Sequence, residues 1–142
     1  MKLVKHVLDR KGRRIIAVKP NDSVLEAIRV MAEQNIGAVV VMQDDQLLGI
    51  MSERDYARKV IVKGRASDTT PVSDIMTGDV LTTSDGETVN DCMEMMTERK
   101  IRHLPVVEGE SVVGMISIGD LVEAIIADQQ EEIEQLEHYI SG

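Results

Sequence analysis

The sequence predicts a mixed α/β fold of the α+β type: two tandem β-α-β-β-α units packed about a pseudo-twofold axis, plus a C-terminal helix. The first observation is a repeat, because residues 49–55 (GIMSERD) recur as residues 114–120 (GMISIGD) at an offset of 65. The same offset pairs Val24 with Val89, and no gap is needed from there to the end of the motif. The second is size, because each copy is too short to bury a good core alone. The third is that both copies show the same order of apolar patterns.

The first copy begins with a short strand expected at residues 15–18, and the polar segment at residues 19–23, which contains Pro20, ends it. Ser23 with Glu26 is a capping box, and apolar residues at helical spacing predict a helix that ends near Asn35. Residues 37–42 are a continuous apolar run, which is typical of a buried strand. The remaining elements are strands at residues 37–42 and 47–51 and a helix from Ser52 through Val60.

The second copy follows a polar linker at residues 63–71 and a helical turn at residues 72–76. Its expected elements are a strand at 80–83, a helix at 89–98 capped by Thr88 with Asp91, strands at 104–107 and 112–116, and a helix from Ser117. The expected domains are unit one with the N-terminal segment (1–66), unit two (67–127) and a C-terminal helical extension (128–142). Residues 1–14 are basic and only weakly periodic.

The final helix continues past the repeat and carries a narrow apolar seam. Ile126, Ile133 and Ile140 fall seven residues apart, with Leu136 between the last two, on an otherwise acidic segment. Such a seam packs against another helix or docks on its own domain, and two heptads do not decide between these alternatives.

Composition excludes several classes of function. The chain has no Phe or Trp and a formal net charge of −9, which argues against binding to nucleic acid or to an acidic membrane surface. No apolar run reaches the length of a membrane span, and no signal-peptide core follows the N-terminus, so a cytoplasmic protein is expected. The core must be aliphatic.

No catalytic or metal-binding group of residues stands out. The three His residues lie far apart in sequence, and no nucleophile motif or phosphate loop is present. The single Cys92 rules out an internal disulfide and is expected to be a buried, inert thiol. We therefore expect no enzyme activity, no catalytic residues and no metal site.

The repeated Gly-x-x-Ser-x-x-Asp pattern has two interpretations. Ser52 and Asp55, like Ser117 and Asp120, can simply cap the helix that follows each strand. Alternatively, a helix that begins at the carboxyl end of a strand can bind an anion with its free amides, while the Asp accepts hydrogen bonds from a ribose. The residues alone leave both open.

The two units with this motif resemble the CBS domain pair, also called the Bateman module. The segment IRHLPVV at residues 101–107 strengthens the resemblance, since the second motif of the family commonly reads RHLPV there. It extends over roughly residues 18–126, and the form SERDY at 52–56 is similar to stand-alone bacterial members. A separate catalytic domain is not expected.

The resemblance implies a regulatory module that binds an adenosyl ligand in the clefts between the two units: AMP, ADP or ATP, and in some members NAD or S-adenosylmethionine. It implies that Asp55 and Asp120 bind the ribose, and that Ser52 and Ser117 contact the phosphate or the ribose. The further residues implied are Gly37, Ala38, Thr82 and Thr83 in site one, and Arg102, His103, Ala17 and Val18 in site two.

Arg54 and His103 have alternative roles. Arg54, inside the first motif, is expected to bind phosphate, and otherwise lies on a solvated helix face or faces a second subunit. His103 either makes phosphate binding depend on pH near neutrality, or is an imidazole whose hydrogen bonds are satisfied within the crevice. The resemblance also implies a homodimer and an unknown downstream protein partner. The alternative function is an interaction scaffold with vestigial clefts.

Overall fold

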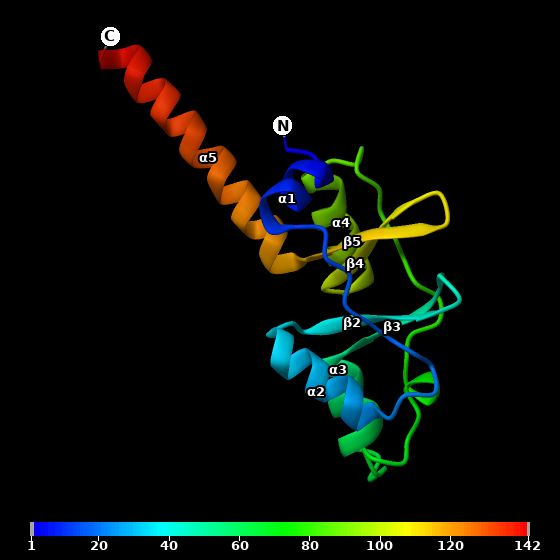
Figure 1. The fold of residues 1–142 in the computed structure, drawn as a ribbon. Coiled ribbons are helices and arrows are strands. Elements are labelled where there is room, and N and C mark those ends of the chain that lie inside the picture. The colour runs from blue at the N-terminus through cyan, green and yellow to red at the C-terminus, as the bar shows by residue number, and fades with distance from the viewer. Residues whose placement is uncertain (1, 142) are drawn as a thin grey trace. The chain divides into compact units, whose positions relative to one another are not determined.

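The computed structural model describes residues 2–141, which form a mixed α/β fold with a C-terminal helix, as the sequence predicts (Figure 1). The helical elements are α1 (Val4–Lys11), α2 (Val24–Gln34), α3 (Glu53–Tyr56), the π-helical η1 (Ala57–Ile61), the 3-10 turn η2 (Val72–Asp74), α4 (Val89–Arg99) and α5 (Ile118–Ser141). The strands are β1 (Ala17–Val18), β2 (Ala38–Gln43), β3 (Gln46–Ser52), β4 (His103–Glu108) and β5 (Ser111–Ser117).

The chain divides into two compact units. The repeat-1 unit contains residues 15–81 with 109–112, and the repeat-2 unit contains the segment up to Arg14, residues 82–108 and the chain from Val113 on. The N-terminal segment thus belongs with the second copy of the repeat rather than with the first. The expected domain boundaries describe the sequence repeat and stay a prediction, as does the pseudo-twofold packing.

The repeat-1 unit is built on a three-stranded sheet of order β1-β2-β3. Strand β1 runs parallel to β2, with Ala17 opposite Val40, and β2 runs antiparallel to β3. Residues 38–41 of β2 are all buried, as expected for its continuous apolar run. The core is aliphatic, as predicted, and its buried members are Val18, Val24, Ala27, Met31, Val39, Val41, Met51, Val60, Val72 and Ile75.

The repeat-2 unit contains β4 and residues 113–117 of its partner strand β5, together with α1, α4 and α5. Both α1 and α4 pack on α5 (Figure 1). The buried positions of α1 are Val4, Val7 and Leu8, which follow helical spacing. Leu104 and Leu121 of the same unit are also 0% exposed. The N-terminal segment is therefore an integral part of this unit.

Helix starts are predicted well by local capping chemistry. Ser23 Oγ accepts the Glu26 amide at 3.1 Å, and Thr88 Oγ1 accepts the Asp91 amide at 3.0 Å. Both helices also end close to the expected residues, with Asn35 and Lys100 in the left-handed conformation. These contacts span three residues, so they are readable from sequence alone.

Three expectations about elements need correction, and one helix was not expected. The strand expected at 80–83 is wrong, because only Thr83 pairs there, in a single parallel bridge to Val106. The strand expected at 15–18 is shortened to β1. The single helix expected from Ser52 is divided into α3 and η1, whose wider turn bonds the Val62 amide to the Ala57 carbonyl. Helix α1 was not predicted, because no side-chain cap marks its start.

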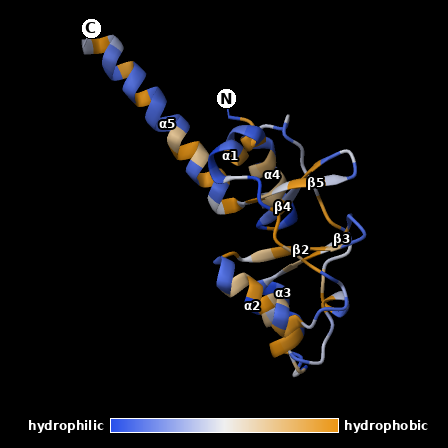
Figure 2. Ribbon diagram, viewed as in Figure 1, coloured by the Kyte–Doolittle hydropathy of each residue, from blue (hydrophilic) through white to orange (hydrophobic). Residues whose placement is uncertain are grey.

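The end of α5 is exposed throughout residues 129–141. Its apolar residues are separated by hydrophilic ones along the helix (Figure 2). Ile133, Leu136 and Ile140 are at least half exposed. Docking on its own domain, one of the two alternatives, therefore does not describe this part of the helix. No helix among the described residues combines the length and the hydropathy needed to cross a membrane.

The two motif glycines allow close chain contacts, and the contacts differ. A Cβ at Gly49 would lie 2.6 Å from Met76 Sδ and 2.8 Å from the backbone oxygen of Thr77. A Cβ at Gly114 would lie 2.8 Å from both δ-carbons of Leu8, which can shift more easily than backbone. The Gly49 contact is held in place by the bridge between Ile50 and Thr77.

We therefore expect Gly49→Ala to lower the free energy of unfolding by about 2–3 kcal/mol, and Gly114→Ala by about 1 kcal/mol. Urea unfolding measures both. Gly86→Ala is the matched control, because nothing lies within 4 Å of a Cβ there. Equal losses for Gly49→Ala and Gly86→Ala would contradict this prediction.

Candidate functional site

The motif of the repeat-1 unit joins the end of β3 to the start of α3. Asp55 Oδ2 accepts the Ser52 amide at 2.9 Å and its hydroxyl at 3.1 Å, while the Asp55 amide donates to Ser52 Oγ at 3.2 Å. Asp55 Oδ1 is 3.0 Å from Lys59 Nζ. The carboxylate therefore lies at the positive end of the helix with an ammonium group beside it.

The motif of the repeat-2 unit repeats this geometry. Asp120 Oδ2 accepts the Ser117 amide at 2.8 Å, and the Asp120 amide donates to Ser117 Oγ at 3.2 Å. Here the ammonium group is that of Lys11, which donates to Asp120 Oδ2 at 2.6 Å and to the Met115 carbonyl at 2.8 Å. The capping interpretation is confirmed in both units, and it leaves the ligand interpretation open.

Sequence reasoning missed both lysines. Lys59 follows Asp55 by one helical turn, a spacing that could have revealed it. Position 124, at the repeat offset from Lys59, is Ala124 instead. Lys11 lies 109 residues from Asp120 and carries no sequence signal of the contact. The repeat-2 unit thus replaces a lysine on its own helix with one from α1.

The residue before each central strand accepts a backbone hydrogen bond from the first residue of the motif helix, and its expected contact with a ligand stays a prediction. The Glu53 amide donates to the Gly37 carbonyl at 3.0 Å, and the Ile118 amide donates to the Arg102 carbonyl at 2.9 Å. Ala38 pairs directly with Ser52 across β2 and β3. Gly37 and Arg102 are related by the repeat offset, so the two units share this contact.

The residues expected to complete each site from the opposite unit are placed as follows. Thr82 and Thr83 belong to the repeat-2 unit, and Ala17 and Val18 to the repeat-1 unit. The side chain of Val18 lies in the core cluster, and Thr83 Oγ1 is 3.2 Å from Cys92 Sγ. Their contact with a ligand in the opposite unit stays a prediction.

Arg54 occupies the first turn of α3, next to the motif carboxylate, and is half-buried. Its expected phosphate contact also stays a prediction. Cys92 is buried, and burial raises the pKa of its thiol, consistent with an unreactive side chain. Among residues 2–141 no group of three or more His, Cys, Asp or Glu side chains is placed to hold a metal ion.

His103 begins β4 and is half-buried. Burial lowers the pKa of its imidazole, the charge of Lys11 lowers it further, and that of Asp120 partly opposes both. The charge of Arg102 also lowers the pKa of His103. The neutral imidazole is therefore the favoured form in the folded protein near pH 7.

This lowered pKa predicts a pH dependence of stability. Below its ordinary pKa of 6.5, the unfolded chain binds a proton at His103 that the folded chain resists. The free energy of unfolding of the wild type, relative to His103→Gln, should stay constant above pH 7 and decrease as the pH falls below 6.5. Urea unfolding at pH 8 and pH 5.5 measures the difference. Parallel pH profiles for the two proteins would contradict the prediction.

Comparisons with known proteins agree with this architecture. The family model of the CBS domain matches residues 4–62 and 72–127. The mitochondrial CBS domain-containing protein CBSX3 of Arabidopsis thaliana is 42% identical over 127 residues, which are 86% of this chain and 62% of that protein. The chain thus spans less than two thirds of this relative.

Two solved structures are informative. A protein with CBS domains from Burkholderia ambifaria has a TM-score of 0.87 and 46% identity, with 90% of this chain and 96% of that chain covered. The CBS domain pair of the protein MJ0100, solved with 5′-methylthioadenosine and S-adenosyl-L-methionine, has a TM-score of 0.81 and 25% identity, with 90% and 98% covered.

Proposed function

This chain belongs to the CBS domain family, and from that premise we propose that it is a regulatory module that binds an adenosyl nucleotide through its two Ser-Asp motifs. The ligand candidates are AMP, ADP and ATP, with NAD and S-adenosylmethionine as further members of the same chemical class. Binding changes the surface that the module presents to a downstream protein partner. Such signalling requires that the ligand bind one conformation of the module more tightly than another.

The observation that carries the proposal is the recurrence of one polar arrangement in both units. Each motif Asp bonds the backbone amide of its Ser and also has a lysine ammonium group within 3.0 Å. A carboxylate can accept hydrogen bonds from a ribose diol, and an adjacent ammonium group can bind the phosphate attached to that ribose. Helix capping by itself requires no lysine at these positions.

The likeness to MJ0100 supports the choice of ligand class. That protein binds two adenosyl compounds, and its structure aligns with 90% of this chain. Neither compound carries a phosphate, so the lysines of this chain favour a phosphate-bearing ligand over those two.

A thermal-shift screen tests the proposal. The purified chain is heated with AMP, ADP, ATP, NAD, S-adenosylmethionine and, as a control, GTP. A ligand at 100 times its dissociation constant stabilises the folded state by about 2.7 kcal/mol, which raises the melting temperature measurably. We expect a rise with adenosyl compounds and none with GTP.

An interaction scaffold with vestigial clefts is the alternative function. The exposed apolar residues of α5 favour this alternative, because they offer a protein-binding surface that requires no bound nucleotide. The absence of a shift with every compound, on protein shown to carry no co-purified nucleotide, would support the scaffold and contradict nucleotide sensing.

The finer assignment of a homodimer rests on two complementary surfaces. The end of α5 is acidic with exposed Ile133 and Leu136, while Ile61 and Val62 are exposed on a basic segment that ends at Arg65. A second copy of the chain therefore offers a surface of opposite charge to each α5. In sedimentation analysis Ile133→Asp/Leu136→Asp should shift the dimer to monomer; an unchanged dimer would place the interface elsewhere.

The proposal includes no catalytic role, in keeping with a family whose stand-alone members are regulatory. Residence in the cytoplasm stays a prediction, which fractionation of cells expressing the tagged chain would test.

A further inference from the structure

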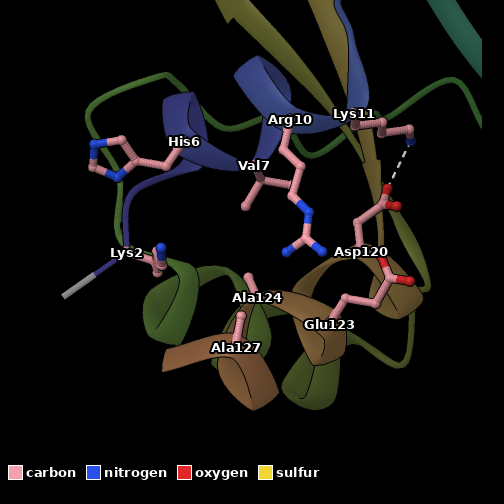
Figure 3. Close-up of a pocket in the computed structure, with 9 residues that line it drawn as sticks. All are labelled: Lys2, His6, Val7, Arg10, Lys11, Asp120, Glu123, Ala124 and Ala127. Atoms are coloured by element: carbon pink, nitrogen blue, oxygen red, sulfur yellow. Dashed lines mark hydrogen bonds and ion pairs between the residues drawn. The ribbon is translucent and has the colours of Figure 1, made fainter. Parts of the chain in front are cut away.

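A pocket of about 360 Å³ lies within the repeat-2 unit, between α1 and α5 (Figure 3). Its volume is within the range of small-molecule sites. Val7, Ala124 and Ala127 contribute its apolar surface. Asp120, the motif carboxylate, lies at one end. The pocket is therefore continuous with the proposed ribose position.

Three cationic side chains line this pocket, together with the carboxylates of Asp120 and Glu123. Lys11 lies beside Asp120, Arg10 extends into the middle, and Lys2 lies toward the opposite end (Figure 3). The chain as a whole is acidic, with a net charge of −9, yet six of its 16 Lys and Arg residues fall within the first 14 positions. Positive charge is thus concentrated on the one segment that forms this wall.

The three cations differ in how they are neutralised. Lys11 is paired with Asp120 at 2.6 Å, and Lys2 Nζ lies 3.9 Å from Asp128 Oδ1 and 3.6 Å from Glu131 Oε1. The guanidinium group of Arg10 points into the pocket and has no hydrogen-bond or ion-pair partner among residues 2–141. Its planar set of donors suits two oxygens of a phosphate.

We infer that the α1–α5 pocket binds a di- or triphosphate group, with Arg10 as the bidentate donor and with Lys11 and Lys2 on either side of it. A row of cations at successive positions suits a chain of phosphates better than a single one. This inference rests on the proposed function in one respect: it takes the phosphates to belong to the nucleotide whose ribose binds Asp120. A free polyphosphate has the same chemistry, and the experiment separates the two sources.

Isothermal titration calorimetry of the full chain with adenosine, AMP, ATP and inorganic tripolyphosphate tests the inference. Arg10→Gln should weaken ATP binding about 10- to 100-fold, as for loss of a charged hydrogen bond, and leave adenosine binding unchanged. Arg14→Gln is the matched control, because this exposed arginine does not line the pocket. It should change ATP affinity less than about twofold. Raising the salt concentration should reduce the effect of Arg10→Gln.

The possible outcomes are distinct. Arg10-dependent binding of ATP without binding of tripolyphosphate alone supports a nucleotide phosphate site, whereas Arg10-dependent binding of both supports a site that also takes free polyphosphate. If tripolyphosphate binds through Arg10 while adenosine and AMP do not bind, the pocket stands and the proposed function fails. Equal affinities of wild type and Arg10→Gln for ATP and tripolyphosphate, or no binding of either, would overturn the inference.

Discussion

The variant Asp120→Asn should lose about 10- to 100-fold in affinity for the adenosyl ligand at the repeat-2 unit, and Asp55→Asn should do the same at the repeat-1 unit. The reason is that a ribose diol donates to an ionised carboxylate, and one charged hydrogen bond contributes about 1.5–3 kcal/mol. Asn keeps the size of the side chain and one acceptor oxygen. The double variant should therefore bind the ligand weakly at both motifs, as measured by calorimetry.

The choice of Asn limits the structural side effects. Its amide oxygen can still accept the Ser52 or Ser117 amide, which the motif carboxylate accepts at 2.9 Å and 2.8 Å. Asp91→Asn is a matched control, because Asp91 lies at the same position in the first turn of α4 but outside the motif. Its ligand affinity should equal that of the wild type.

Lys59→Gln separates phosphate binding by the lysine from ribose binding by the motif carboxylate. Lys59 contacts Asp55 Oδ1 and also donates to the Ile75 carbonyl at 2.9 Å. If it binds phosphate as proposed, its loss weakens AMP binding more than adenosine binding at the repeat-1 unit.

Wild-type affinity in the Asp55→Asn/Asp120→Asn protein would contradict the assignment of the motif and leave Ser52 and Ser117 as caps only.

Leu8→Ala should lower the free energy of unfolding by about 3–5 kcal/mol, the largest stability effect we expect from one substitution. Leu8 is 0% exposed, and its δ-carbons lie close to Gly114 in β5. Removing three carbons leaves a cavity at this contact, which the surrounding strand and helices fill only in part. Urea unfolding followed by circular dichroism measures the loss.

The same variant tests how α1 is attached. Val122→Ala also shortens an apolar side chain to alanine, at a helix position that is 43% exposed and lies outside the proposed dimer surface, and it should change stability by less than about 0.5 kcal/mol. A loss below about 1 kcal/mol in Leu8→Ala would mean that α1 does not pack into the core of the repeat-2 unit. Detachment of α1 would also remove Lys11 from Asp120 and Arg10 from the pocket.

Much of the fold could be predicted because its signals are local. The caps at Ser23 and Thr88 connect a side chain to an amide three residues on, and both Ser-Asp motifs close in the same way. The burial of β2 can be predicted from its continuous run of apolar residues. The repeat offset then transfers each assignment from one copy to the other.

Errors arose where the local signal is weak. Residues 80–83 form no strand, because only Thr83 finds a partner along β4. Helix α1 has Leu3 before it, which offers no capping oxygen, and its apolar residues number only three. Its burial depends on the surface presented by α5 and β5, more than 100 residues further along the chain.

The sequence by itself determined the repeat, the aliphatic cores, the helix starts and the family, because each of these depends on residues close together or on the pattern they form. Only the tertiary structure decided that α1 joins the repeat-2 unit, that Lys11 takes the place which Lys59 occupies in the other unit, and that Arg10 points into a pocket against α5. These contacts join residues about 110 positions apart. Their existence depends on which apolar surfaces pack together, and that is settled by the free energy of the whole folded unit rather than by any short segment.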